Sequence, residues 1–388
     1  MKILWVNPSF LDYRIPVYKR LYELTGGNFY ILFSKKRVSE RICLKIQEAV
    51  GGNAICFEGE KRIIFGEKEG MSNKWMSFPI TKGLYKRIKK IDADIVIAEG
   101  FFQWTPQAVR YVFFHRKPLL IEYERTKHTE RSCPKWRMIY RKLVDQFVSG
   151  YLCNGKLTKE YLFNEMKIKK DNLFVGGMSA DSEGLVSAIQ SMSVEECITL
   201  RNKLNINNSG IVYIYVGQLI ERKGVIYLLN AWKKHIRKYN QDNLLIVGGG
   251  DLYDSFVDKF GNEVSIHFTN GIDYDNIYKY YAISDVFIIP TLEDNWSLVV
   301  PEAMACGLPI ACSIYNGCYP ELVHEGENGK LFDPLKQETV IEALDTFHRV
   351  DLQKYGEYSR KIEKYYNHER TANNIYAACV EVLNRNNK

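Results

Sequence analysis

Alternation of short apolar runs with helical patterns constrains the fold of this chain more than any other feature. In the first half, apolar runs with strand character occur at 3–6, 29–33, 95–98, 118–121, 150–153 and 172–175. Between them, residues 15–24 and 134–148 carry apolar side chains three and four positions apart, which is typical of helices. This alternation predicts an α/β fold with one doubly wound parallel sheet.

A second series of the same kind begins at residue 211. Predicted strands at 211–217, 244–250, 265–268 and 286–290 alternate with predicted helices at 225–239, 253–260 and 274–282. Because 388 residues exceed most single cores, the two series predict two domains.

The predicted domain boundary lies in a segment rich in small residues. GGMSADSEG at 176–184 interrupts the alternation like a linker, before a predicted helix at 194–204. We therefore expect one domain over 1–178 and a second over 179–369. A final helical pattern at about 370–388 is expected to pack back on the first domain.

Composition favours a cytoplasmic globular protein. Hydrophobic residues make up 46% and charged residues 26%, as in ordinary folded domains. The nine cysteines include no CxxC pair, which argues against a secreted disulfide framework. Met1-Lys2 leads directly into ILWVN, so no signal peptide is expected, and no apolar run reaches the ~18 residues of a membrane span.

Charge is divided unevenly along the chain. Residues 1–180 contain 33 Lys and Arg against 18 Asp and Glu, which gives +15, and the remainder contains 20 against 28, which gives −8. In TKGLYKRIKK, at 81–90, Leu84 and Ile88 recur at helical spacing with Ile91 among five basic residues. This pattern predicts a surface helix touching anionic lipid at the inner face of a membrane, or else a solvated helix face. Nucleic acid is not an expected partner, because no nucleic-acid-binding motif accompanies the charge.

The richest stretch for site chemistry is 284–334. The strand at 286–290 is followed by Glu293 and Asp294, and then by a helical segment at 297–306 that carries Glu302. Open parallel sheets bind ligands at the carboxyl ends of their strands, where a helix N-terminus can hold phosphate. Glu302 can accept two hydrogen bonds from a ribose diol. The predicted phosphate-binding N–H groups belong to Ser297, Leu298 and Val299.

Two glycine turns supply further donor-site candidates. Gly217 ends a predicted strand and is followed by Arg222 and Lys223, two cations that suit a diphosphate. Gly248 and Gly249 in LLIVGGGD permit close approach of the backbone to a nucleotide. The dinucleotide fingerprint GxGxxG is absent from the first strand of the unit, so an NAD site is not predicted.

The order GQLIERKG, VGGGD, WSLVVPEAMACGLPI and NGKLFDP, over about 211–334, resembles the retaining GT-B glycosyltransferases of family 4. The resemblance implies two Rossmann-like domains facing a central cleft, with a nucleotide sugar, most commonly a UDP-sugar, held mainly by the second. It implies that Arg222 and Lys223 bind the diphosphate and that Glu302 binds the ribose. The acid that contacts the donor sugar falls on Asp294, where the family usually has Glu. Its neighbour Glu293 stays an alternative.

The first domain offers candidates for the acceptor side. Tyr13 and Arg14 follow the first strand, where some family members read YR.P, and the resemblance implies that this loop faces the cleft. The loop after residue 121 is either a solvated polar run or part of the site. His128 is its catalytic candidate, able to hydrogen-bond a sugar hydroxyl, although the family's leaving phosphate is thought to take the acceptor proton. The other candidates there are Glu122, Glu130 and Arg131.

No metal or other cofactor is expected. Asp92 and Asp94 precede a strand rather than follow one, which favours capping over metal binding, and no His or Cys cluster has metal-ligand spacing. The predicted function is transfer of a sugar from a nucleotide sugar to an oligosaccharide or polyprenyl-diphosphate-linked acceptor in surface polysaccharide assembly. The alternatives are a nucleotide-sugar epimerase or hydrolase of the same fold, or a non-catalytic nucleotide-sugar-binding protein.

Overall fold

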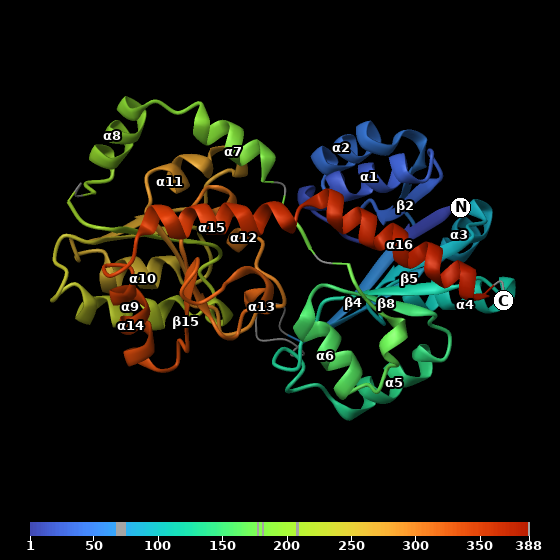
Figure 1. Ribbon diagram of the computed structural model, residues 1–388. Helices are drawn as coiled ribbons and strands as arrows, with labels where there is room; N and C mark the ends of the chain where they lie inside the picture. Colours follow the sequence, from blue (N-terminus) through green and yellow to red (C-terminus); the bar gives the residue numbers. More distant parts are fainter. Residues whose placement is uncertain (67–74, 177, 181, 207–208, 387–388) are drawn as a thin grey trace. The chain divides into compact units, whose positions relative to one another are not determined.

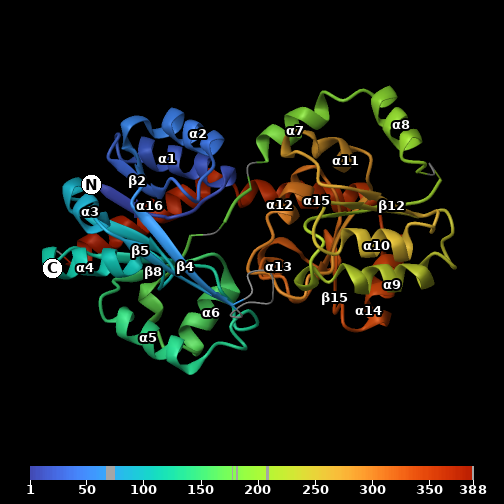
Figure 2. The same cartoon turned by 180° about the vertical axis from the view of Figure 1, so that it is seen from behind.

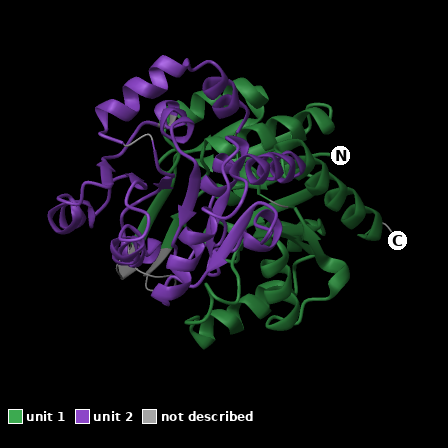
Figure 3. Cartoon of the chain, turned by 60° about the vertical axis from the view of Figure 1, so that its left-hand side comes forward, with its two compact units in different colours: residues 1–68, 72–181, 366–388 green, residues 69–71, 182–365 purple. Residues whose placement is uncertain are grey.

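The computed structural model of the chain contains two compact units (Figures 1 and 3). The first unit ends at Asp181 and resumes at Tyr366, and the second runs from Ser182 to Tyr365. Each unit contains a parallel sheet with helices packed on it, so the predicted α/β class with two Rossmann-like domains is confirmed. The described residues are 1–66, 75–176, 178–180, 182–206 and 209–386.

Unit 1 is built on a seven-stranded parallel sheet in the order β3-β2-β1-β6-β7-β8-β9. The interior strand β1 is buried at every position, as expected for an apolar run covered on both faces. The edge strand β3 is the one the sequence pattern does not predict, because only its two end residues are buried. The strands are β1 (Ile3–Val6), β2 (Phe29–Ser34), β3 (Ala54–Phe57), β6 (Ile95–Glu99), β7 (Leu119–Tyr123), β8 (Gly150–Cys153) and β9 (Leu173–Val175).

The helices of unit 1 form two layers, one on each face of its sheet. One layer shares a buried cluster with alternate residues of β1 and consists of α1 (Ile15–Leu24), α2 (Glu40–Val50) and α16 (His368–Asn386). The other shares a second cluster and consists of α3 (Leu84–Ile91), α4 (Thr105–His115), α5 (Lys135–Asp145) and α6 (Lys156–Asn164). The C-terminal helix α16 lies along α1 (Figure 1), so residues from both ends of the chain complete this unit.

The basic segment predicted to touch lipid is packed inside unit 1. An antiparallel hairpin, β4 (Glu60–Gly66) with β5 (Trp75–Thr81), ends at the start of this segment, and α3 follows. Leu84, Ile88 and Ile91 are buried against the sheet, while the basic residues of the helix remain exposed. The apolar side of this helix therefore packs on the protein core and cannot enter lipid, whereas contact of its exposed basic side with lipid stays a prediction.

Unit 2 contains a six-stranded parallel sheet in the order β12-β11-β10-β13-β14-β15. Its edge strands β12 and β15 are labelled in Figure 2. β10 and β13, at the middle of the sheet, are apolar and almost fully buried, which explains why the sequence pattern identifies them. The strands are β10 (Val212–Val216), β11 (Asn243–Val247), β12 (Ile266–Thr269), β13 (Val286–Ile289), β14 (Ile310–Ser313) and β15 (Gly329–Phe332).

Helices cover the sheet of unit 2. A buried cluster joins it to α9 (Val225–His235), α10 (Tyr253–Phe260) and α14 (Gln337–Thr346). α12 (Val299–Ala305) packs against β13 and β14, and α15 (Leu352–Tyr365) packs on α12. The remaining helices are α7 (Glu183–Gln190), α8 (Val194–Lys203), α11 (Tyr278–Ala282) and α13 (Tyr319–Leu322). Single 3-10 turns are η1 (Asp12–Arg14), η2 (Gly51–Asn53), η3 (Lys170–Asn172), η4 (Glu221–Lys223) and η5 (Tyr274–Asn276).

Two predicted segments differ in detail from the structure. The helix expected over 274–282 is divided into η5 and α11. The predicted linker at 176–184 includes positions 177 and 181, which lie outside the described residues, and α7 begins within its last two positions. Across the described ranges, no helix combines the length and the apolar character needed to cross a membrane.

Candidate functional site

Two glycine turns lie side by side at the carboxyl ends of β10 and β11. These strands pair in register from Val212 with Asn243 onward, and the Gly217 N–H donates to the Val247 carbonyl over 3.0 Å. A Cβ atom on Gly248 would lie 2.0 Å from the Gly217 carbonyl oxygen. The predicted nucleotide turns are therefore a place where two backbones touch, and only glycine fits at Gly248.

The basic turn η4 is joined to the loop after β13 by its backbone. The carbonyl of Arg222 accepts hydrogen bonds from the Leu292 N–H, over 2.8 Å, and from the Thr291 hydroxyl, over 3.2 Å. Gly224 ends the turn with φ 65, and a Cβ atom there would lie 2.2 Å from the Pro290 carbonyl oxygen. These contacts place the two predicted diphosphate cations next to the acidic loop.

Lys223 and Asp294 form the central ion pair of this site. Lys223 Nζ lies 2.5 Å from Asp294 Oδ2, and Arg222 Nη1 lies 3.9 Å from the same oxygen. Burial raises the pKa of Asp294, but Lys223, with smaller contributions from Ser297 and Arg222, holds the resulting pKa below its ordinary value. The carboxylate is therefore charged at neutral pH, and its neighbours are the two cations predicted to bind the diphosphate.

The two candidate sugar acids occupy different surroundings. Asp294 Oδ1 accepts from the Trp296 N–H over 3.1 Å, while its main chain bonds to Tyr315 and Gly317 in the loop after β14. The neighbouring Glu293 is buried, and its carbonyl accepts from Arg222 over 3.4 Å. The structure thus brings the Asp294 carboxylate against Lys223.

Glu302 lies in the first turn of α12, close to α11. It is buried, and its Oε2 accepts a hydrogen bond from the Tyr281 hydroxyl over 3.3 Å. At the start of the helix, the Ser297 N–H donates to Asn316 Oδ1 over 3.4 Å. Leu298 is the N-cap and Val299 the first residue of α12, so the three predicted phosphate-binding N–H groups lie at its beginning.

Asn316 and Tyr281 are site residues that sequence reasoning missed. Asn316 is fully buried, and its Oδ1 also accepts from the Cys318 N–H over 3.5 Å, so one side chain orders two loops. The only sequence signal for Asn316 is an Asn-Gly pair after a predicted strand, which marks a turn without indicating a site. The sequence around Tyr281 gives no signal of a site, because its role is a contact with Glu302 from another helix, which spacing along the chain does not reveal.

In unit 1, Arg14 and Glu122 meet at the carboxyl ends of β1 and β7. Arg14 Nη2 lies 2.5 Å from Glu122 Oε1, and both side chains are buried. Nearby, burial and then the Glu122 carboxylate raise the pKa of Glu99, an acid that sequence reasoning missed. Tyr13 lies beside Arg14, with 5.8 Å between its ring centre and the guanidinium carbon, and burial raises the pKa of its hydroxyl.

The candidates in the loop after β7 are divided between two environments. His128 and Arg131 line a cavity of about 570 Å³ together with Tyr161 on α6. Glu130 instead points into the protein, where its carboxylate lies 2.6 Å from Arg141 and 3.2 Å from Arg125. Glu130 thus forms a buried ion pair between α5 and the loop.

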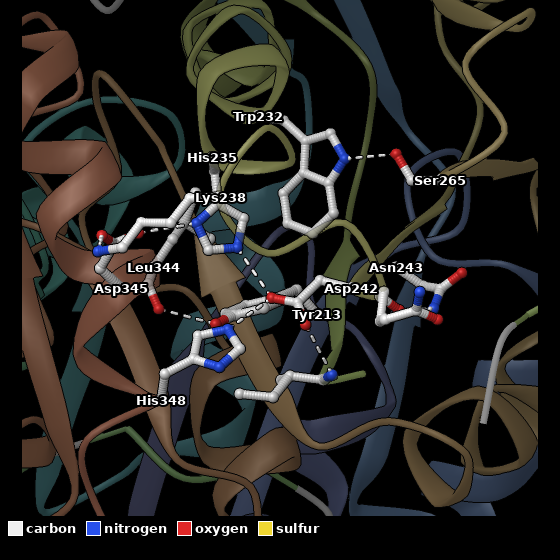
Figure 4. A network of polar contacts seen from close by, with 12 residues as sticks. Tyr213, Trp232, His235, Lys238, Asp242, Asn243, Ser265, Leu344, Asp345 and His348 are labelled. Atoms are coloured by element: carbon white, nitrogen blue, oxygen red, sulfur yellow. Dashed lines mark hydrogen bonds and ion pairs between the residues drawn. The ribbon is translucent and has the colours of Figure 1, made fainter. Parts of the chain in front are cut away.

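One cluster with metal-ligand chemistry is present among the described residues, contrary to the expectation from sequence spacing. Asp242 Oδ2 lies 2.9 Å from His235 Nε2 and 2.7 Å from His348 Nε2, and His235 Nδ1 lies 2.9 Å from Asp345 (Figure 4). Spacing missed it because His348 follows α14, over a hundred residues after His235. Asp242 precedes β11, so the cluster lies at the opposite strand ends from the glycine turns.

Comparisons with known proteins assign the second unit to a family. Residues 198–365 match the family described as Glycosyl transferases group 1. Unit 2 carries a glycosyl transferases group 1 domain. This domain includes the glycine turns, the basic turn and the acidic loop.

Proteins similar to this chain match it over different lengths. An uncharacterized glycosyltransferase of Haemophilus influenzae is 27% identical over 310 residues, which cover 76% of this chain and 79% of that protein. The alpha-monoglucosyldiacylglycerol synthase of Acholeplasma laidlawii is 26% identical over 51% of this chain and 50% of its own length. An uncharacterized glycosyltransferase of Methanocaldococcus jannaschii is 29% identical, and the match spans 40% of each protein.

Solved structures share the fold of this chain. The Anabaena Alr3699/HepE structure in complex with UDP has a TM-score of 0.75 at 15% identity and covers 98% of this chain and 100% of its own. The lipopolysaccharide outer core galactosyltransferase WaaB has a TM-score of 0.67 at 13% identity, over 98% and 99% of the two chains. At such identities the likeness shows the fold alone, which is the GT-B class.

Proposed function

We propose that this protein is a retaining glycosyltransferase of family 4 that transfers a sugar from a nucleotide sugar, most simply a UDP-sugar, to an oligosaccharide or lipid-linked acceptor. The observation that carries the proposal is the ion pair between Lys223 and Asp294, set between the glycine turns and the start of α12. Cations for a diphosphate and an acid for a sugar hydroxyl are thereby adjacent, as a nucleotide sugar requires.

When the donor binds, the charged side chains of this site exchange their partners within the protein for groups of the donor. The diphosphate takes over Lys223 and Arg222, and Asp294 then accepts hydrogen bonds from hydroxyls of the donor sugar. Glu302, near the start of α12, accepts from the ribose hydroxyls. The close contact of Gly217 with Gly248 leaves bare backbone beside the nucleotide.

The transfer step needs no protein nucleophile in this proposal. The bond between the anomeric carbon and the diphosphate oxygen breaks, and the acceptor oxygen bonds to the same face of that carbon. The departing diphosphate takes the acceptor proton, so the products are a glycosylated acceptor and a nucleoside diphosphate. Arg222 and Lys223 stabilise the negative charge that develops on the diphosphate, without a requirement for a metal.

The acceptor side is assigned to unit 1. His128 and Arg131 line its cavity of about 570 Å³ and can hydrogen-bond a polar acceptor group. Similar proteins include an alpha-monoglucosyldiacylglycerol synthase and a GDP-mannose-dependent phosphatidylinositol monomannoside mannosyltransferase. These names support a lipid-linked or glycan acceptor. We place the protein in the cytoplasm, at the inner face of a membrane and in surface polysaccharide assembly, as part of the same proposal.

Donor screening followed by product analysis tests the proposal. Thermal unfolding with UDP, GDP, ADP and their sugars identifies the donor that stabilises the protein, and NMR of the product reports the anomeric configuration. We expect transfer with retention. Products formed without an acceptor would indicate an epimerase or hydrolase, and stabilisation without any turnover would indicate a non-catalytic binder.

Variants of the donor site sharpen this test. Lys223→Ala and Glu302→Ala should each lower transfer about 100-fold or more, because each removes a charge-assisted contact to the donor. Lys259→Ala, which removes an exposed cation from α10, is the matched control and should leave the rate unchanged. Near wild-type transfer by both site variants would overturn the assignment.

A further inference from the structure

Helix α5 faces outward with its apolar residues and inward with its arginines. Trp136, Ile139 and Leu143 lie along one side of the helix and are 46%, 61% and 55% exposed. Arg137 and Arg141 are buried on the opposite side. Val144 is buried on the inward side as well, so the exposed apolar residues form a second apolar side, where a surface helix normally carries polar residues.

The inward side of α5 is determined by a buried acid. Arg141 Nη1 donates to Glu130 Oε2 over 2.6 Å and to the Tyr161 hydroxyl over 3.2 Å, which ties α5 to the loop after β7 and to α6. This pairing fixes which side of the helix is buried. It does not require apolar residues on the other side, where polar side chains would fold equally well. The exposed apolar residues therefore call for a separate explanation.

The exposed apolar surface continues from α5 onto α4. Phe147, just after α5, lies 5.7 Å from Phe113 between ring centres, and Phe113 lies 5.2 Å from Phe114. Phe113 and Phe114 are at the end of α4 and are well exposed. We call the six exposed side chains of Phe113, Phe114, Trp136, Ile139, Leu143 and Phe147 the outer face of α4 and α5.

Positive charge surrounds this outer face. Residues 105–117 and 131–147, which contain both helices, include a single acid, Asp145, and eight Lys and Arg, of which Arg137 and Arg141 are buried and do not contribute to this face. The Asp145 carboxylate accepts from the Tyr151 hydroxyl over 2.7 Å, within unit 1. Lys135 and Lys142 on α5 and Arg116 after α4 are exposed beside the apolar side chains. Apolar side chains next to cations fit the boundary between the headgroups and acyl chains of an anionic lipid bilayer.

We propose that the outer face of α4 and α5 docks on an anionic membrane surface. This inference rests on the proposed function for its purpose, because it would hold the protein beside a lipid-linked acceptor. The aromatic and aliphatic side chains enter the interface, and the flanking Lys and Arg meet anionic headgroups. A second copy fits poorly, because a two-fold interface would set this basic face against itself.

Vesicle flotation of the full chain tests the docking surface. Wild-type protein should float with vesicles of phosphatidylglycerol and phosphatidylcholine at low salt, and much less with phosphatidylcholine alone or at high salt. The double variant Ile139→Ser, Leu143→Ser should bind the anionic vesicles about tenfold more weakly or worse. Lys135→Glu combined with Lys142→Glu should remove the preference for anionic vesicles.

The matched control lies on an exposed apolar pair of unit 2. Val194 and Ile198 of α8 are both exposed, so Val194→Ser with Ile198→Ser removes similar apolar surface at another place and should leave vesicle binding unchanged. All of these substitutions are on the outside, so thermal unfolding should stay at the wild-type temperature. Undiminished binding of anionic vesicles by the Ile139, Leu143 variant would overturn the proposal.

Two more readouts separate the remaining outcomes. A wild-type dimer in light scattering that dissociates in the Ile139, Leu143 variant, with no vesicle binding, would assign the surface to a second copy or another protein and overturn the proposal. Transfer to a short water-soluble acceptor should be equal in the variant and the wild type. Vesicle binding without any transfer would leave the docking surface in place and refute the proposed function.

Discussion

Asp294 shows how a single side chain depends on its charged neighbours. Burial alone would favour its protonated form, yet the ammonium of Lys223 keeps its pKa below the ordinary value. A carboxyl group of this kind stabilises the folded protein above its unfolded pKa of about 3.9, and the contribution is lost as the pH falls through the lower, folded pKa. The ion pair therefore links donor chemistry to acid stability.

Replacement of Asp294 by asparagine tests this linkage. We expect Asp294→Asn to be less stable than the wild type at neutral pH, because Lys223 loses its partner. The difference should shrink as the pH falls from about 4 through the lower, folded pKa of Asp294, because the wild-type carboxyl is then neutral like the amide. Urea unfolding of both proteins at a series of pH values measures this difference in the free energy of unfolding. A difference that does not change with pH would contradict the linkage.

Sequence reasoning reached the residues of the donor site that carry charge at strand ends. Lys223 and Asp294 could be proposed because each lies just after an apolar run, where a parallel sheet collects its ligands. Asn316 and Tyr281 could not, since their contribution is a hydrogen bond to a group from a different element. Glu99 was missed although it directly follows the predicted strand at 95–98, because its raised pKa depends on burial and on Glu122 from the neighbouring strand.

At the scale of elements, the turns after β10 and β11 depend on one close contact. Gly248 has φ 144, and a side chain there would collide with the Gly217 carbonyl oxygen. We expect Gly248→Ala to lower the free energy of unfolding by at least about 1 to 3 kcal/mol from backbone strain, and to weaken nucleotide binding. Chemical unfolding and calorimetric titration with UDP measure the two effects.

Gly271 provides the control for this substitution. It lies in the loop after β12, where an added Cβ atom would meet nothing within 4 Å. Gly271→Ala should therefore change both stability and nucleotide binding little. Equal effects at Gly248 and Gly271 would show that the contact between the two turns does not matter.

Helix α5 shows what periodicity can and cannot predict about an element. Apolar spacing at 134–148 correctly indicated a helix, because the repeat of a helix does not depend on which side is buried. The buried side follows instead from the pairing of Arg141 with Glu130, which joins two segments. In α3 the apolar spacing again predicted the helix, but the spacing alone did not show that its apolar side packs against the sheet of unit 1.

At the scale of the whole molecule, the core of unit 1 depends on a helix from the far end of the chain. α16 places Ile375 and Cys379 in the cluster that contains Tyr18 of α1. We expect Ile375→Ala to destabilise unit 1 by about 2 to 5 kcal/mol, as is usual when a buried isoleucine is truncated to alanine. Asn373→Ala, at an exposed position of the same helix, should be nearly neutral.

Hydrogen exchange can assign this loss to one unit. Amides of β1 and α1 should lose protection in Ile375→Ala, while amides of β10 and β13 in unit 2 should keep theirs. Equal loss of protection in both units would contradict a core that belongs to unit 1 alone. The sequence predicted two domains from its repeated alternation, but the periodicity of 370–388 carries no information about which core that helix completes.

The return of α16 to unit 1 also sets an order of events during protein synthesis. Residues 1–181 leave the ribosome long before residues 368–386, and at 5–20 residues per second about 10 to 40 s separate them. Throughout that interval the nascent chain holds the apolar side of α1 open to water, or to a chaperone. Unit 2, whose described core comes from one continuous stretch, can finish folding first. The middle of the chain therefore completes its core before unit 1, which needs both end segments.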